Sequence, residues 1–193
     1  MFNLIKLNDT IRIDPSRFGF PLEDAAIEEL RNKYEGLVDE ELGYIIRVID
    51  TEIKRVGRII PGDGGTHHQV TFTILTYYPE LQEIIEGEVV EVADFGTFLR
   101  IGPVDALLHV SQLMDDFISY DERQGVLLGR ESGRTISRGD IFRVRIVAVS
   151  FPRGRSSGKI GVTARQPLLG KVDWIQEEVE EIERPEEEEG EEE

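Results

Sequence analysis

The chain has 193 residues, a formal net charge of −17 and no cysteine, with 39% hydrophobic and 32% charged side chains. This length allows one domain or two small ones, and the absence of cysteine excludes disulfides, thiolate metal sites and a thiol nucleophile. Because no apolar run reaches the length of a membrane span and the N-terminal residues lack a signal-peptide pattern, we expect a cytoplasmic protein that does not bind membranes.

Residues 1–80 have the pattern of a small α+β domain, with one helix on an antiparallel sheet. Residues 1–14 alternate apolar and polar side chains, which predicts one strand, or two strands with a break near Asn8. Pro21 then opens a helix with acidic residues in its first turn, where the helix dipole favours them. The apolar stripe of this helix consists of Leu22, Ala26, Leu30 and Tyr34.

Two further strands complete this domain. Residues 43–60 are rich in isoleucine and valine, and residues 70–74 alternate, which predicts a hairpin with residues 61–66 at its tip. The glycines of the tip do not indicate a phosphate-binding loop, because the Gly-Lys-Ser/Thr ending and the following helix are missing. His67 and His68 do not indicate a metal site, because adjacent side chains on a strand point to opposite faces.

Residues 81–172 have the pattern of an all-β domain, a five-stranded OB barrel. Gly96 interrupts the first two strands and predicts a bulge, where the sheet coils into a barrel. A turn of helix is expected after Leu113, and an extra hairpin within residues 120–138. The five expected strands are residues 87–93, 97–101, 105–110, 141–149 and 158–164.

Charge is distributed unevenly along the second half of the chain. Residues 138–171 hold eight basic side chains and one acidic one, which is typical of a phosphate-binding surface, although such arginines also keep strand edges soluble. The candidate RNA-binding side chains of this kind are Arg100, Arg143, Arg145, Arg153, Arg155 and Lys159. Residues 173–193 are predicted to form an acidic tail that begins with a short helix and is disordered beyond Pro185.

Phe95 and Phe98 are candidate stacking residues. An exposed ring offers a flat face to any base and stabilises binding by about 1–3 kcal/mol per stacked base, with little sequence preference. The alternative is that both rings belong to the core, where phenylalanine usually lies. Residues 95 and 98 of a regular strand point to opposite faces, and we expect a bulge at Gly96 to return them to one face.

The segment from Gly87 to Ser111 resembles the RNA-binding OB domain first described as the repeat of the largest small-subunit ribosomal protein. In that family two aromatic side chains and a histidine lie together on one face of the barrel and contact RNA, which implies this role for Phe95, Phe98 and His109. Lys159 matches the family's basic position in the fifth strand, whereas Ser150 replaces an acidic residue found in many members. The matching residues are Gly87, Val89, Phe95, Gly96, Phe98, Leu108, His109, Val110 and Ser111.

Residues 1–172 resemble the E′ subunits of archaeal DNA-directed RNA polymerases, counterparts of the seventh subunit of eukaryotic RNA polymerase II. The resemblance includes the order of the two domains and the extra hairpin. The resemblance implies a non-catalytic stalk subunit without metal or cofactor. It implies pairing with the small F subunit of the polymerase, and an OB domain that faces the nascent single-stranded RNA and aids initiation and processivity. It also implies docking on the polymerase core through the tip loop of Pro61, Gly62, Asp63, Gly64 and Gly65.

Two alternative functions belong to other classes. The first is a stand-alone RNA-binding or translation-associated OB-fold factor, which would lack an exposed apolar surface for the F subunit in the N-terminal domain. The second is a nuclease, which needs clustered carboxylates to hold two metal ions. The acidic residues before the tail are scattered without such a spacing, so the sequence favours a binding protein.

Overall fold

The computed structural model describes residues 1–151 and 158–183. The chain divides into two compact units, Met1–Pro79 and Glu80–Glu193, here called the N-terminal unit and the barrel unit. The predictions for Arg153, Arg155 and the tail beyond Pro185 lie outside the described residues. Within the described part of the chain, no helix is long and apolar enough to cross a membrane.

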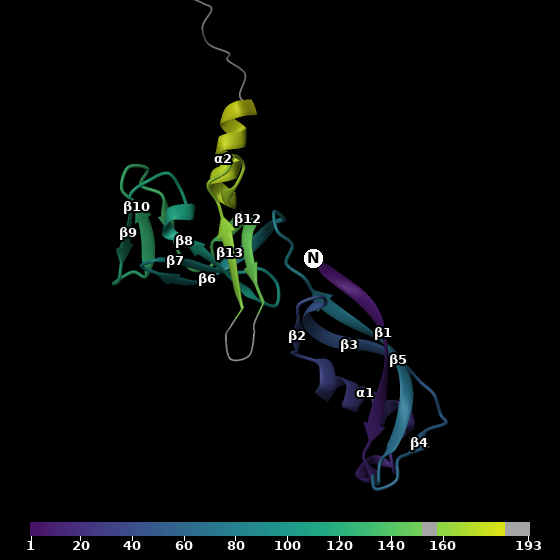
Figure 1. The fold of residues 1–193 in the computed structure, drawn as a ribbon. Helices are drawn as coiled ribbons and strands as arrows, with labels where there is room; N and C mark the ends of the chain where they lie inside the picture. The colour runs from purple at the N-terminus through teal and green to yellow at the C-terminus, as the bar shows by residue number, and fades with distance from the viewer. Residues whose placement is uncertain (152–157, 184–193) are drawn as a thin grey trace, which may run out of the picture. The chain divides into compact units, whose positions relative to one another are not determined.

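The N-terminal unit is an antiparallel sheet with one main helix on one face (Figure 1). The strand order is β1-β5-β3-β2, and the short β4 pairs with the N-terminal end of β5. These elements are β1 (Phe2–Ile13), a 3₁₀ turn (Pro15–Arg17), α1 (Leu22–Tyr34), β2 (Val38–Asp39), β3 (Gly43–Ile53), β4 (Arg58–Ile59) and β5 (Thr66–Tyr77).

The core of the N-terminal unit lies between α1 and the sheet. Ala26 and Leu30 of α1 are fully buried, and Phe72 and Ile74 of β5 are buried beneath them. Side chains of β1 alternate in the same way, so Ile11 and Ile13 join this core while the even-numbered residues face outward. The predicted helix on an antiparallel sheet is confirmed.

One detail of this unit decides between two predicted alternatives, and another differs from the prediction. The first strand is continuous, because β1 pairs with β5 from Phe2 to Ile13 without a break. The strand expected over residues 43–60 ends at Ile53. Beyond it, the buried His68 ring bonds the Lys54 carbonyl through Nδ1 at 2.9 Å, and Gly57 passes so close that a Cβ there would lie 2.5 Å from His68 Nε2.

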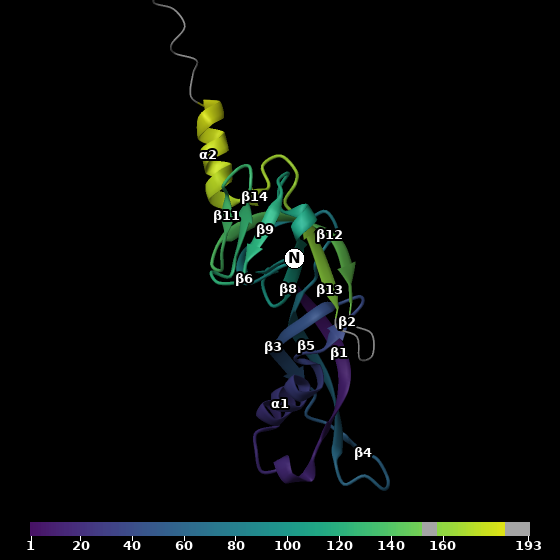
Figure 2. The same ribbon diagram turned by 90° about the vertical axis from the view of Figure 1, so that its left-hand side faces the viewer.

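The barrel unit is a closed five-stranded barrel with an inserted small sheet and a C-terminal helix (Figures 1 and 2). Its strands are β6 (Ile84–Ala93), β7 (Gly96–Arg100), β8 (Asp105–His109), β12 (Ile141–Ser150) and β13 (Lys159–Thr163). The order β13-β8-β7-β6-β12 closes through pairing of β12 with β13. The OB barrel predicted from the sequence is confirmed.

The other elements decorate this barrel. A 3₁₀ turn, η2 (Val110–Gln112), follows β8 directly, whereas a helical turn was expected after Leu113. The extra hairpin is a three-stranded sheet of β9 (Ile118–Asp121), β10 (Val126–Gly129) and β11 (Thr135–Ile136). Figure 2 shows β11 and β14 (Gly170–Lys171) at the base of α2 (Val172–Glu183).

The barrel interior is apolar and extends to α2. Val89, Leu99, Leu108 and Phe142 are fully buried in it. Trp174 of α2 is 9% exposed and packs edge-on against Phe142, with ring centroids 5.8 Å apart. The helix predicted at the start of the acidic tail is therefore part of the folded barrel unit.

Gly96 marks the closest approach of β7 and β8. Its φ of +151° is one that residues with a side chain rarely adopt. A Cβ at this position would lie 2.3 Å from the Leu108 carbonyl oxygen and 2.9 Å from the His109 Cα. Because both neighbours are backbone, no rotamer change relieves the clash.

We therefore expect Gly96→Ala to destabilise the barrel unit by about 3 kcal/mol, the upper range for a strained backbone site. Gly125→Ala is the matched control: Gly125 has a φ of +65° but nothing within 4 Å of its Cβ, so about 1 kcal/mol is expected. Urea unfolding followed by the fluorescence of Trp174, the one tryptophan, measures both. Equal losses would contradict the close-approach argument.

Candidate nucleic-acid interface

Phe95 and Phe98 lie together on the outside of the barrel. Phe95 is 45% exposed and Phe98 is half-buried, and neither belongs to the buried core cluster. Their ring centroids are 6.1 Å apart with an interplanar angle of 86°, an edge-to-face contact. The expectation that the two rings share one face outside the core is confirmed.

The reason for this placement is not the predicted bulge at Gly96. Ala93 pairs with Gly96, so Asp94 and Phe95 form a two-residue turn and Phe95 is not a strand residue. The register irregularity lies instead in β6, between Val89 and Glu91. The turn brings the ring of Phe95 back over β7, where it meets the side chain of Phe98.

His109 ends β8 directly opposite Gly96 and is exposed. Its Nδ1 accepts a hydrogen bond from the Ser111 backbone N–H at 3.2 Å, and the Ser111 hydroxyl lies 2.9 Å from the same atom. With Nδ1 occupied as an acceptor, the proton of the neutral ring sits on Nε2, which can donate to a ligand. The following residue, Val110, donates its N–H to the Phe95 carbonyl at 2.8 Å, which ties the histidine to the aromatic turn.

Lys159 lies on the strand next to β8. The parallel register of β13 on β8 pairs Gly161 with Leu107, and Leu107 pairs across with Phe98. Lys159, two residues before Gly161, points to the same side and is exposed. No ion pair of its ammonium group occurs among residues 1–151 and 158–183. We call the outer surface with Phe95, Phe98, His109 and Lys159 the aromatic face.

Arg100 borders the aromatic face but is already paired. Its Nε and Nη2 donate to the two carboxylate oxygens of Asp105 at 2.6 and 3.1 Å. This bidentate contact raises the pKa of Arg100. A phosphate could therefore bind the Arg100 guanidinium only by displacing the Asp105 carboxylate.

Arg143 and Arg145 lie on β12, which pairs with β6 and β13 and not with β7, the strand of Phe98. Arg143 donates to Glu86 of β6 at 2.9 Å through Nη2. Arg145 donates to the Gln82 carbonyl at 3.3 Å, and its buried Nε has no hydrogen-bond partner among the described residues. The structure does not bring these two arginines together with Phe95 and Phe98.

Sequence reasoning counted Arg165 among the basic residues but did not assign it to the site. Its Nη1 donates to the Ser111 carbonyl at 3.2 Å, so the residue that orients His109 also anchors this guanidinium. The available signal was the two-residue spacing from Lys159 through Thr163 to Arg165, although β13 itself ends at Thr163.

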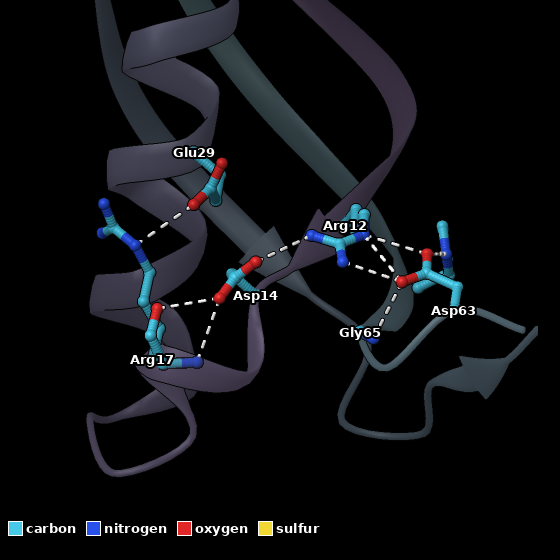
Figure 3. Close-up of polar contacts among 8 residues, drawn as sticks. Arg12, Asp14, Arg17, Glu29, Asp63 and Gly65 are labelled. Atoms are coloured by element: carbon cyan, nitrogen blue, oxygen red, sulfur yellow. Dashed lines mark hydrogen bonds and ion pairs between the residues drawn. The ribbon is translucent and has the colours of Figure 1, made fainter.

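The tip loop of the N-terminal unit is held by a network of charges (Figure 3). Arg12 of β1 donates to Asp63 through Nη2 at 2.7 Å and to Asp14 through Nη1 at 3.0 Å. Asp63 also accepts from the Gly65 backbone N–H at 3.0 Å, and His67 Nε2 lies 2.9 Å from its other oxygen. Pro61, Gly62 and Gly64 stay exposed, so the network fixes the loop from beneath.

Both units match known protein families. Residues 8–64 match a family described as "SHS2 domain found in N terminus of Rpb7p/Rpc25p/MJ0397", and residues 78–161 match "S1 RNA binding domain". The chain is 39% identical over 175 residues to DNA-directed RNA polymerase subunit Rpo7 of Saccharolobus shibatae, covering 91% of this chain and 97% of the relative.

Two further relatives, one archaeal and one eukaryotic, show the same similarity over most of the chain. The chain is 38% identical over 179 residues to subunit Rpo7 of Sulfolobus acidocaldarius, covering 93% of this chain and 97% of that one. It is 28% identical over 176 residues to DNA-directed RNA polymerase III subunit RPC8 of Bos taurus, covering 86% of each.

The tip network predicts a pH dependence. Hydrogen bonds from Arg12, then from Gly65 and His67, hold the pKa of Asp63 far below its usual range, and those from Ser16 and Arg12 lower the pKa of Asp14 to about 2. Because the folded pKa values lie below the unfolded ones, the stabilisation is fully present above the ordinary aspartate pKa of about 3.9 and is lost as the pH falls through the folded values.

We expect Arg12→Gln to raise the pKa of Asp63 toward the ordinary value, measured by NMR titration of the carboxyl carbon. The difference in melting temperature between the variant and the wild type should be present at pH 6 and shrink toward pH 2. Arg58→Gln, on β4 and with no described carboxylate partner, is the control and should leave Asp63 unchanged. An unchanged titration of Asp63 in the Arg12 variant would contradict this assignment.

Proposed function

The chain belongs to the Rpo7 family of DNA-directed RNA polymerase subunits, and from this premise we propose that it is a non-catalytic stalk subunit of the enzyme. In this proposal it pairs with the F subunit, docks on the polymerase core and binds single-stranded RNA as it emerges, which aids initiation and processivity. It acts in the cytoplasm together with the polymerase. The observation that carries the RNA-binding role is the exposed Phe95–Phe98 pair beside His109.

The aromatic face suits an unpaired strand of any sequence. Stacking on a ring contributes about 1–3 kcal/mol per base and does not depend on the donors and acceptors of the base edge. Lys159 and the Nε2–H of His109 add contacts that phosphate, sugar or base oxygens can accept. Such a surface holds a transcript without stopping at particular sequences, and its affinity falls with salt because phosphate contacts release counterions.

Acidic side chains around the aromatic face limit the affinity for RNA that we propose for it. Asp105 holds Arg100, and Glu88 and Glu91 of β6 pair with Arg100 and Phe98 across the sheet. Arg143 and Arg145 remain predicted phosphate contacts, on a different side of the barrel from the rings. The proposed grip is therefore loose, in keeping with a strand that must slide.

The tip loop of the N-terminal unit suits docking on the core. Asp63 fixes its shape, so little conformational entropy is lost when it binds. Ile59 and Ile60, 74% and 49% exposed, flank the loop and present apolar surface that a partner can cover. The loop of Pro61, Gly62, Asp63, Gly64 and Gly65 is accordingly the proposed contact with the core.

Pairing with the F subunit has support in the uncovered face of the N-terminal sheet. Phe2 and Leu4 of β1 point away from α1 and are 58% and 68% exposed. Contiguous apolar side chains of this kind are typical of a surface that another protein covers. A stand-alone RNA-binding factor has no need of such a surface.

We expect Phe95→Ala and Phe98→Ala each to weaken the binding of a labelled oligouridylate by about fivefold to a hundredfold, the equivalent of one lost stacking contact. Fluorescence anisotropy measures this. Phe18→Ala, which removes a 53% exposed ring from the N-terminal unit, is the control and should change the affinity less than twofold. Full affinity of both variants, or their collapse in circular dichroism, would refute the assigned role.

Docking is tested by co-purification with the F subunit and the core polymerase. Asp63→Ala frees the tip loop, and we expect its retention on the core to fall about tenfold, equivalent to about 1.4 kcal/mol of lost preorganisation, while pairing with the F subunit is unchanged. Asp50→Ala on β3 is the control. A monodisperse monomer that ignores both partners would instead favour a stand-alone RNA-binding factor.

A further inference from the structure

Arg165 and Asp115 form an ion pair at the edge of the aromatic face. The Arg165 Nη2 donates to Asp115 Oδ1, and Nη1 donates to the Ser111 carbonyl at 3.2 Å. Ser111 also supplies the N–H and hydroxyl that contact His109 Nδ1. One residue of η2 thus joins the histidine of the aromatic face to a guanidinium outside it.

The strand register leads to the same position. Leu107 of β8 pairs with Gly161 and Leu108 with Val162, so His109 and Thr163 are the next residues of the two strands in this parallel register. Thr163 is only 5% exposed because Gln112 of η2 covers it, with its Oε1 accepting from Thr163 Oγ1 at 2.8 Å. Arg165 follows two residues later, beyond the end of β13, and is exposed.

We propose that Arg165 is a further RNA contact that binds a backbone phosphate, and that Asp115 is a built-in competitor that occupies the guanidinium until the phosphate displaces it. This inference rests on the proposed RNA-binding function. The pair thereby helps to set the affinity for RNA. In the free protein the charge of Arg165 is compensated by Asp115, and in the complex it is compensated by an RNA phosphate.

The ion pair is suited to exchange. The side chains of Arg165 and Asp115 are 40% and 88% exposed, and exposed pairs of this kind contribute little to stability. A phosphate offers the planar guanidinium fork the same geometry as a carboxylate with more negative charge. The bond from Nη1 to the Ser111 carbonyl holds the arginine in place while Asp115 returns to water.

Asp115 is held close to Arg165 by its neighbour. Asp116 accepts hydrogen bonds from the Ser132 hydroxyl at 2.7 Å and from the backbone N–H groups of Ser132 and Glu131 at 3.0 and 3.1 Å. The bonds from Ser132 lower the pKa of Asp116 to about 2, so it is ionised at neutral pH. The segment is thereby fixed to the turn between β10 and β11, which keeps Asp115 beside Arg165 in the free protein.

The test measures anisotropy of a labelled oligouridylate with the full chain. Asp115→Asn should tighten binding about threefold to tenfold, because the competing charge is gone. Arg165→Gln should weaken binding by a similar factor and reduce the slope of log affinity against log salt by about 0.7, the value for one lost phosphate contact on a single strand. In the double variant, Asp115→Asn should give no gain.

Glu178→Gln is the matched control, since it removes a carboxylate from another arginine–carboxylate pair of the barrel unit, with Arg134 at 3.3 Å. It should change affinity less than twofold. A gain for Asp115→Asn no larger than this, or one that persists with Arg165→Gln, overturns the inference while RNA binding stands. Absence of any wild-type binding overturns both.

If Arg165→Gln unfolds, Arg165→Lys replaces it. This variant keeps the positive charge but loses the planar guanidinium that makes two hydrogen bonds to a phosphate, so undiminished affinity would contradict the proposed arginine–phosphate contact.

Discussion

The contact between Gly96 and the backbone of β8 is the constraint on which the aromatic face depends. Only hydrogen fits between the Gly96 Cα and the Leu108 carbonyl, and this lets β7 start immediately after a two-residue turn. The turn carries Phe95 outside the strand, and its carbonyl receives the Val110 N–H. Because that bond fixes the start of η2, the same approach also sets the orientation of His109.

The proposed RNA binding has to be reconciled with a strongly acidic chain, and the distribution of charge around this face does so. Twelve of the 26 glutamates lie in residues 177–193, while the aromatic face keeps one free ammonium group, Lys159, among the described residues. Most of the nearby arginines carry a carboxylate partner, as Arg100 and Arg165 do. In the proposed RNA binding, affinity therefore rests on stacking, with charge as a smaller and salt-dependent contribution.

Features that depend on a local pattern of residues could be predicted from the sequence. Features that depend on contacts between residues far apart in the chain could not. Alternation and helical spacing predicted the sheet, α1 and the five barrel strands, and the family resemblance supplied the aromatic pair. The placement of Phe95 was predicted for the wrong reason, because the turn length depends on how Gly96 meets His109 across the sheet. Counting basic residues overestimated the free charge, since Arg143 meets a glutamate 57 positions away. Just beyond the early end of β3, the Lys54 carbonyl bonds the His68 ring, a contact between distant residues that no local pattern reveals.

The central claim is that the two rings outside the barrel are where RNA meets the chain. The most direct measurement is an NMR titration of the full chain, with isotope-labelled phenylalanine and histidine rings, against an unlabelled oligouridylate. The account predicts that the resonances of Phe95, Phe98 and His109 shift together and saturate at one affinity, while those of the buried Phe142 stay unchanged. Saturable binding that leaves these three rings unmoved and shifts residues elsewhere would contradict it.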